Sequence, residues 1–183
     1  MNNNLEKYDI LVNKTNKLSF SYKPNDLIKI CEKYSKCEQY LRKKAKESFE
    51  KMAHDIEANN MKIIAVSTYR SYTYQDKLFK KYVQEKGFKY ARLCSAKAGC
   101  SEHQTGLAVD IANNNLDYDN FDKTKEFLWV KENCWKYGFI MRYPKGKTDI
   151  TGYKYEPWHY RYVGNIAKKI YDNNLTLEEY KIN

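Results

Sequence analysis

A metal-ligand pattern and a strand pattern meet in one segment of the chain, Ser101-Glu102-His103-Gln104-Thr105-Gly106-Leu107-Ala108-Val109-Asp110-Ile111. Its last four residues can alternate along a strand, which would point Asp110 into a pocket and bury Val109 on the opposite face. Gly106 permits the sharp backbone turn that would fold His103 back toward this strand. The segment therefore predicts two metal ligands, His103 and Asp110, at the start of a strand.

A third candidate ligand, His159, lies much later in the chain, in Glu156-Pro157-Trp158-His159-Tyr160-Arg161-Tyr162-Val163. Two imidazoles and one carboxylate form a zinc set that leaves the fourth position open, as catalytic zinc sites do. We therefore expect Zn²⁺ bound by His103, Asp110 and His159. Cys100 is close enough to His103 that a thiolate ligand is an alternative.

These blocks resemble the VanY-type D-alanyl-D-alanine carboxypeptidases of the LAS zinc metallopeptidase group (lysostaphin, D-Ala-D-Ala metallopeptidase, sonic hedgehog), and also their L,D-carboxypeptidase relatives. The group's metal-site pattern is met by Ser101, His103, Gly106, Ala108, Asp110, Glu156 and His159. A further block, Ser67-Thr68-Tyr69-Arg70-Ser71, resembles the group's substrate-binding Tyr-Arg-Ser segment. The blocks follow the family order and span most of the chain.

The resemblance implies a zinc-dependent D,D-carboxypeptidase that removes the terminal D-Ala from peptidoglycan stem peptides. Glu156 is the expected general base for the attacking water. Arg70 would stabilise the oxyanion or hold the terminal carboxylate, since its forked donors suit either anion. Gln75, Ser101 and Tyr155 are further candidates for orienting polar groups of the substrate.

Three other functions stay open at this point. An L,D-carboxypeptidase acting on the tetrapeptide stem would use the same ligands, and so would a phage-type wall endopeptidase on the same scaffold. A zinc-containing binding module without catalysis would be expected to lack the base, yet Glu156 is present.

Composition limits the class of protein. The 183 residues suffice for one core, so we expect an extended lead-in over residues 1–22 and a single domain over 23–183. The formal net charge is +10, but only five of the 33 basic residues are Arg, which argues against a nucleic-acid partner. The Lys excess fits solubility or attraction to the anionic cell wall.

The chain has no apolar run long enough to span a membrane. Its start does not resemble a secretory leader. We expect extracytoplasmic action at the cell wall with any leader already removed, and we favour a monomer.

The hydrophobic pattern predicts an α+β fold with a small, mainly antiparallel sheet flanked by helices, and the resemblance implies a hedgehog or D,D-peptidase-like architecture. We expect helices over 24–33, 38–59, 73–86, 88–94, 124–137 and 165–172, with a last helix capped by Thr176. We expect strands over 62–67, from 108, over 139–142 and over 158–163, and a loop over 143–155 covering the pocket. The odd number of cysteines prevents complete pairing, although Cys94 and Cys100 could form a disulfide in an oxidising setting.

Overall fold

A computed structural model of the chain describes residues 8–182. Its helices and strands follow in chain order as β1 (Leu27–Lys29), β2 (Tyr40–Arg42), α1 (Lys43–Asp55), β3 (Ile63–Ser67), α2 (Tyr72–Lys86), α3 (Phe88–Cys94), β4 (Ala108–Asn113), α4 (Lys125–Asn133), β5 (Phe139–Met141), α5 (Thr148–Thr151), β6 (His159–Tyr162), α6 (Ala167–Asp172) and α7 (Leu177–Ile182). The predicted α+β class is confirmed.

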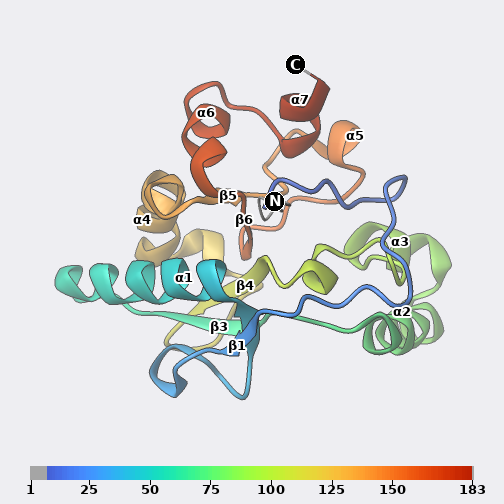
Figure 1. Ribbon diagram of the computed structural model, residues 1–183, viewed down its shortest axis with the longest axis horizontal. Coiled ribbons are helices and arrows are strands. Elements are labelled where there is room, and N and C mark those ends of the chain that lie inside the picture. Colours follow the sequence, from blue (N-terminus) through green and yellow to red (C-terminus); the bar gives the residue numbers. More distant parts are fainter. Residues whose placement is uncertain (1–7, 183) are drawn as a thin grey trace, which may run out of the picture.

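The centre of the fold is a four-stranded sheet in the order β3-β4-β6-β5, accompanied by the two-stranded sheet β1-β2. Every pair of named strands is antiparallel. Figure 1 shows α1 lying along the sheet, α2 and α3 grouped at one end of the molecule, and α5, α6 and α7 together on its upper side.

The main core lies between α1 and one face of the sheet. The predicted stripe on α1 is buried, with Ala45, Phe49 and Met52 each fully inaccessible, and it packs with Val109 and Ile111 of β4. Because side chains alternate along a strand, burying Val109 and Ile111 against α1 directs Asp110 to the other face. The functional side chains occupy that second face.

Two sequence predictions near the start of the domain are wrong. The segment over 24–33 is not a helix: it contains β1, which pairs with β2 so that Leu27 lies opposite Arg42. The helix expected from residue 38 begins only at Lys43, because the preceding backbone bonds elsewhere, with Arg42 N–H donating to the Gly106 carbonyl at 2.9 Å. Long-range backbone hydrogen bonds override the local helix signals here.

Most other element predictions are confirmed within a few residues. The segment expected as a loop over 143–155 carries one short helix, α5. The predicted capping box at α7 is present: Thr176 Oγ1 accepts from Glu179 N–H at 3.2 Å, and Glu179 Oε2 accepts from Thr176 N–H at 2.7 Å.

The described part of the lead-in, residues 8–22, contains no helix or strand and is fastened to the domain by hydrogen bonds. Arg161 Nη2 donates to the carbonyls of Tyr8 at 3.0 Å and Ile10 at 2.7 Å. Leu18 N–H donates to the Gly99 carbonyl at 2.8 Å. Within residues 8–182, no helix combines the length and apolar content needed to cross a bilayer.

The close approach at Gly99 gives a stability prediction. Gly99 has φ +81° and a Cβ there would lie 2.8 Å from the Leu18 carbonyl oxygen, whereas Gly146 has φ +82° and open space around it. Both alanine variants incur the left-handed backbone cost, but only Gly99→Ala also clashes with backbone. We expect Gly99→Ala to lower the free energy of unfolding by roughly 1–3 kcal/mol more than Gly146→Ala in urea denaturation. Equal losses would contradict this packing.

Candidate active site

Strand pairing brings two of the predicted ligands together. Asp110 on β4 lies directly opposite His159 on β6. Side chains of directly opposed residues share one face of the sheet and stand about 5 Å apart at Cβ. The pairing of β4 with β6 therefore brings two side chains that are 49 residues apart in the sequence into direct contact.

The third predicted ligand comes from a tight turn. His103 belongs to the 3-10 turn η3 (Glu102–Thr105), which ends at Gly106 in a left-handed conformation with φ +67°. This conformation lets the chain enter β4 immediately after the turn, as Gly106 suggested in the sequence. His103 is 4 % exposed and its Nε2 lies 3.3 Å from Asp110 Oδ2.

The three side chains have the donor arrangement that a metal ion needs. One atom each from His103, Asp110 and His159 lie within 4.8 Å of one another, and all three residues are buried. His103 Nδ1 lies 2.6 Å from the Thr68 carbonyl, so Nδ1 carries the hydrogen and Nε2 is directed to Asp110. His159 Nε2 faces the Glu102 carboxylate at 3.5 Å, while its Nδ1 is 2.9 Å from Asp110 Oδ1.

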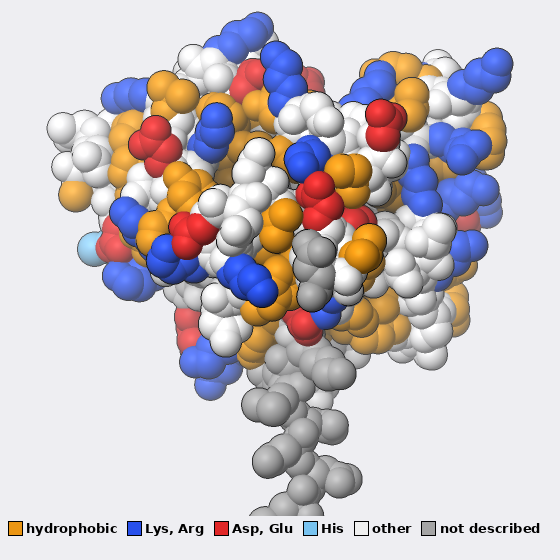
Figure 2. Space-filling view, turned by 90° about the horizontal axis from the view of Figure 1, so that it is seen from above, with side chains coloured by type: hydrophobic (Ala, Val, Ile, Leu, Met, Phe, Trp, Pro, Cys, Tyr) orange, Lys and Arg blue, Asp and Glu red, His pale blue; other side chains and the backbone are white. Residues whose placement is uncertain are grey.

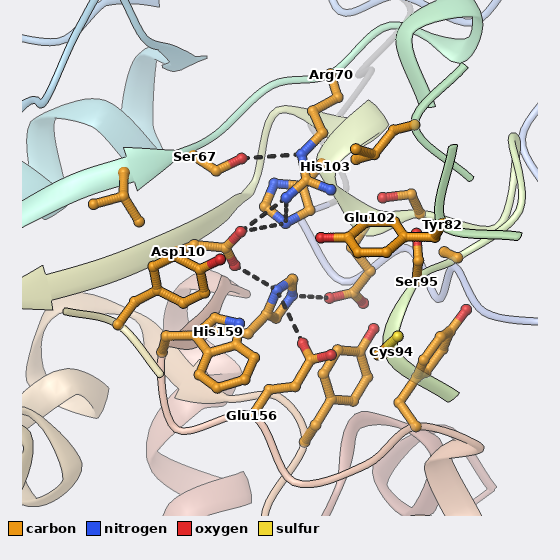
Figure 3. A pocket seen from close by; sticks show the side chains of 18 of the residues that line it. Ser67, Arg70, Tyr82, Cys94, Ser95, Glu102, His103, Asp110, Glu156 and His159 are labelled. Atoms are coloured by element: carbon orange, nitrogen blue, oxygen red, sulfur yellow. Dashed lines mark hydrogen bonds and ion pairs between the residues drawn. The ribbon is translucent and has the colours of Figure 1, made fainter. Parts of the chain in front are cut away.

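Each imidazole thus has one nitrogen held by an outer acceptor and the other turned toward the same aspartate. Figure 3 shows His103 and His159 both directed at Asp110, and His159 also at Glu102. Metal-binding histidines show this pattern, because the outer acceptor fixes the tautomer and the ring orientation. The residues present therefore fit a divalent metal such as zinc.

Burial and charge set the protonation of this group. Burial, followed by the charge of Arg70, lowers the pKa of His103 to about 4, so the ring is neutral at pH 7. Burial favours a neutral Asp110, but the adjacent His103 and His159 hold its pKa well below the usual range. Burial also opposes a charged His159, yet hydrogen bonds to Asp110 and Glu102 raise its pKa to about 9.

Glu156 lies beside the three donors without belonging to their group. Its Oε2 is 3.8 Å from His159 Nδ1, and its side chain is 12 % exposed. Figure 3 shows Glu156 pointing toward His159 from the side opposite Arg70. Burial raises the pKa of Glu156 to about 7, which is suitable for a group that exchanges protons near neutral pH.

Arg70 reaches the donors from the end of β3. Its Nη2 donates to Asp110 Oδ2 at 2.9 Å, and its Nε donates to Ser67 Oγ at 2.9 Å. Gln75 is fully buried behind it: Gln75 Oε1 accepts from Arg70 Nη1 at 3.2 Å, and its Nε2 donates to the Ala96 carbonyl at 2.7 Å. Gln75 therefore braces Arg70, whereas the sequence suggested that it would orient the substrate.

The surrounding cavity has a volume of 250 Å³. Ser101 lines it, in agreement with its predicted place. The structure differs for Tyr155, whose side chain packs against the main core. Trp158 also lines the cavity and meets Tyr118 edge to face with 5.5 Å between ring centroids.

Sequence reasoning missed Glu102. Its side chain is fully buried, and Oε1 accepts from Arg142 Nε at 2.8 Å and from Arg161 Nη1 at 2.7 Å. Burial would raise its pKa, but the two guanidinium groups hold it well below the usual range. Glu102 is therefore an anion that accepts from His159 Nε2. Its position next to His103 was the available signal, but both arginines lie about 40 to 60 residues away.

The alternative thiolate ligand is not supported. Cys100 is buried but does not belong to the three-donor group, and burial raises the pKa of its thiol. All five cysteines are free, including Cys94 and Cys100.

Comparisons with known proteins agree with this geometry. The profile of the VanY family, D-alanyl-D-alanine carboxypeptidase, matches residues 38–165. The chain is 44% identical over 187 residues to YodJ of Bacillus subtilis (strain 168), which carries the name of a carboxypeptidase; the match covers 97% of this chain and 68% of YodJ.

Two solved structures share the fold. The LdcB LD-carboxypeptidase superposes with a TM-score of 0.87 at 45% identity, covering 94% of this chain and 84% of LdcB. A mutant of the vancomycin resistance D,D-pentapeptidase VanY, in complex with Zn(II), superposes with a TM-score of 0.83 at 34% identity, covering 96% and 99%. The predicted resemblance is confirmed.

Proposed function

The chain belongs to the VanY family of D-alanyl-D-alanine carboxypeptidases, and on this premise we propose that it is a zinc-dependent peptidase that removes the terminal D-Ala from peptidoglycan stem peptides. The observation that carries the proposal is the buried group of His103, Asp110 and His159 with Glu156 beside it.

His103 Nε2, one oxygen of Asp110 and His159 Nδ1 would hold the zinc ion, because these atoms face one another. When bound, zinc acts as a Lewis acid toward the scissile carbonyl and lowers the pKa of a water molecule to about 7. His159, whose pKa is raised to about 9, would release its proton when the ion binds. Two neutral imidazoles and one carboxylate would then leave the ion a net positive charge, which suits both effects.

Glu156 would accept the proton of the attacking water on its carboxylate and pass it to the leaving amine. A carboxyl with a pKa of about 7 both accepts and releases a proton readily near neutral pH. Its position outside the donor group keeps its oxygens available for this transfer.

Arg70 would bind the negative charge of the substrate, either the developing oxyanion or the terminal carboxylate. Gln75 and Ser67 hold its guanidinium from behind, which leaves less side-chain entropy to lose on binding. Ser101, in the cavity wall, would contact a polar group of the substrate.

Removal of D-Ala from the tetrapeptide stem is the second candidate function, because the LdcB LD-carboxypeptidase matches at 45% identity. Purified protein incubated with tri-, tetra- and pentapeptide stems distinguishes the two. We expect the pentapeptide to lose its terminal D-Ala, which mass spectrometry detects. A pentapeptide ending in L-Ala-L-Ala should keep its terminal alanine. Release from the tetrapeptide alone would overturn the D,D assignment in favour of L,D cleavage.

The substrate class implies where the enzyme acts. Stem peptides belong to the cell wall, so we propose extracytoplasmic action. The net charge of +10 would favour association with an anionic wall.

Glu102 gives a prediction about metal affinity. Glu102→Gln removes the anion that accepts from His159 Nε2, so the ring loses its fixed orientation. We expect zinc affinity to fall about 10–100-fold in competition with a chromophoric chelator. Glu178→Gln is the matched control, because Glu178 pairs with the same Arg142 at 2.6 Å without contacting His159. A fall of equal size in both variants would mean that Glu102 acts only through stability.

A further inference from the structure

A second cavity, of 260 Å³, adjoins the catalytic cavity and shares two wall residues with it, Ser95 and Tyr153. Four cationic side chains line it, those of Lys14, Lys17, Arg92 and Lys97. We call this cavity the cationic pocket. Figure 2 shows Lys and Arg side chains gathering at the right-hand end of the molecule, the end that carries α2 and α3 in Figure 1.

These four cations lack acidic partners. Within residues 8–182, none of them has a carboxylate oxygen within 4.0 Å. Several lysines elsewhere on the surface do have such a partner, as Lys51 has Asp55 at 2.9 Å and Lys80 has Asp76 at 2.6 Å, and what sets the four apart is that they line one cavity. The cavity therefore concentrates positive charge that residues 8–182 do not pair with a carboxylate.

Aromatic rings lie beside three of the four cations at the cavity wall. Lys14 Nζ lies 4.6 Å from the centroid of Tyr153, and Arg92 and Lys97 lie 5.6 and 5.3 Å from that of Phe88. Lys14 also donates to the Gly152 carbonyl. Burial and the charge of Arg92 lower the pKa of Lys14, which indicates that like charges approach one another here. A cluster of like positive charges of this kind attracts an anion.

A line of ring contacts connects this pocket to the metal ligands. The centroids of His159 and Tyr143 are 4.9 Å apart, those of Tyr143 and Tyr153 are 4.9 Å apart, and Lys14 Nζ follows at 4.6 Å. An extended peptide advances about 3.3–3.6 Å per residue. A substrate group three or four residues from the reacting carbonyl can therefore reach the cationic pocket.

We propose that the cationic pocket is a substrate subsite that binds a carboxylate carried three or four residues to the amino side of the scissile bond. This inference rests on the proposed peptidase function, since that function places the cleaved end of the peptide at His159 and directs the rest of the chain outward. Adjacency to the catalytic cavity favours a carboxylate of the substrate itself over a separate anion.

The test compares two peptides that end in D-Ala-D-Ala and differ only in having Glu or Gln at the proposed position. One such pair places this residue three residues to the amino side of the scissile bond, and a second pair places it four residues away. We expect the native protein to cleave the Glu peptide with roughly three- to tenfold higher kcat/KM, mainly through KM. The double variant Lys14→Gln/Arg92→Gln should lose this preference and keep its kcat on the Gln peptide. The preference should also shrink as NaCl is raised, because salt screens exposed charges.

A charge-matched control is Lys125→Gln/Lys131→Gln, which removes two exposed lysines from α4 at the other end of the molecule and should keep the preference (Figure 1). The single variant Arg92→Gln alters one exposed side chain and should show a partial loss, even if the double variant folds poorly.

Three results would overturn the inference. Equal cleavage of both peptides by the native protein would overturn this inference and leave the proposed function standing. Inhibition of peptide cleavage by inorganic polyphosphate, with no preference of the native protein for the Glu peptide, would also overturn it, because the pocket would then bind a phosphate polymer. Failure to cleave either peptide overturns the proposed function, and this inference with it.

Discussion

Glu156→Gln should lower kcat/KM for D-Ala release by about 10²–10⁴-fold, the range that a positioned general base contributes. The amide has nearly the same shape as the carboxyl but cannot accept the water proton. Zinc content should stay at one ion per chain, because Glu156 lies outside the three-donor group. Stopped assays of D-Ala release, combined with metal analysis, measure both quantities.

The pH profile provides a second readout of the same variant. Burial raises the pKa of Glu156 to about 7, and a bound cation would lower it, so the acidic limb of kcat/KM should lie at or below about pH 7. Activity should fall as the pH drops through this limb, because the protonated carboxyl cannot act as a base. The limb should be absent from any residual activity of Glu156→Gln.

Stability separates a catalytic effect from a folding effect. A carboxyl whose pKa is raised in the folded state costs stability once the pH exceeds its unfolded value, so a neutral glutamine should not lower the melting temperature at pH 8. Glu132→Gln, an exposed change on α4, is the control and should leave activity within about twofold. If Glu156→Gln were as active as this control, the proton acceptor would have to be another group.

His103→Ala should abolish both zinc retention and activity. Removing one of three ligands leaves only two protein donors, Asp110 and His159, for the ion. We expect near-zero zinc after dialysis against equimolar metal. The rise in melting temperature that zinc gives the native protein should also disappear, because a ligand stabilises only a state that binds it.

His54→Ala is the matched control for this prediction. His54 is exposed on α1, and its ring lies 3.3 Å from the neighbouring Asp55. Zinc content and D-Ala release should both be unchanged. An active His103→Ala variant with full zinc would show that the ion binds elsewhere, whereas loss of zinc with full activity would show that the reaction does not need it.

Short-range patterns sufficed for much of the fold and for two of the candidate ligands. Alternation over residues 108–111 marked both the strand and the side of it that carries Asp110, and Gly106 marked the turn that returns His103 to it. The capping box at Thr176 likewise fixed the start of α7. These features depend on neighbours a few residues apart, so the order of residue types contains them.

Only the tertiary structure decided the rest. Residues 27–29, within the segment expected as a helix, form β1 because they pair with β2. Gln75 braces Arg70 because its side-chain oxygen accepts from the Arg70 guanidinium. Glu102 remains charged in the interior only because Arg142 and Arg161 converge on it from distant parts of the chain. Burying a charge is favourable only beside an opposite charge, and a partner 40 to 59 residues away leaves no trace in local spacing.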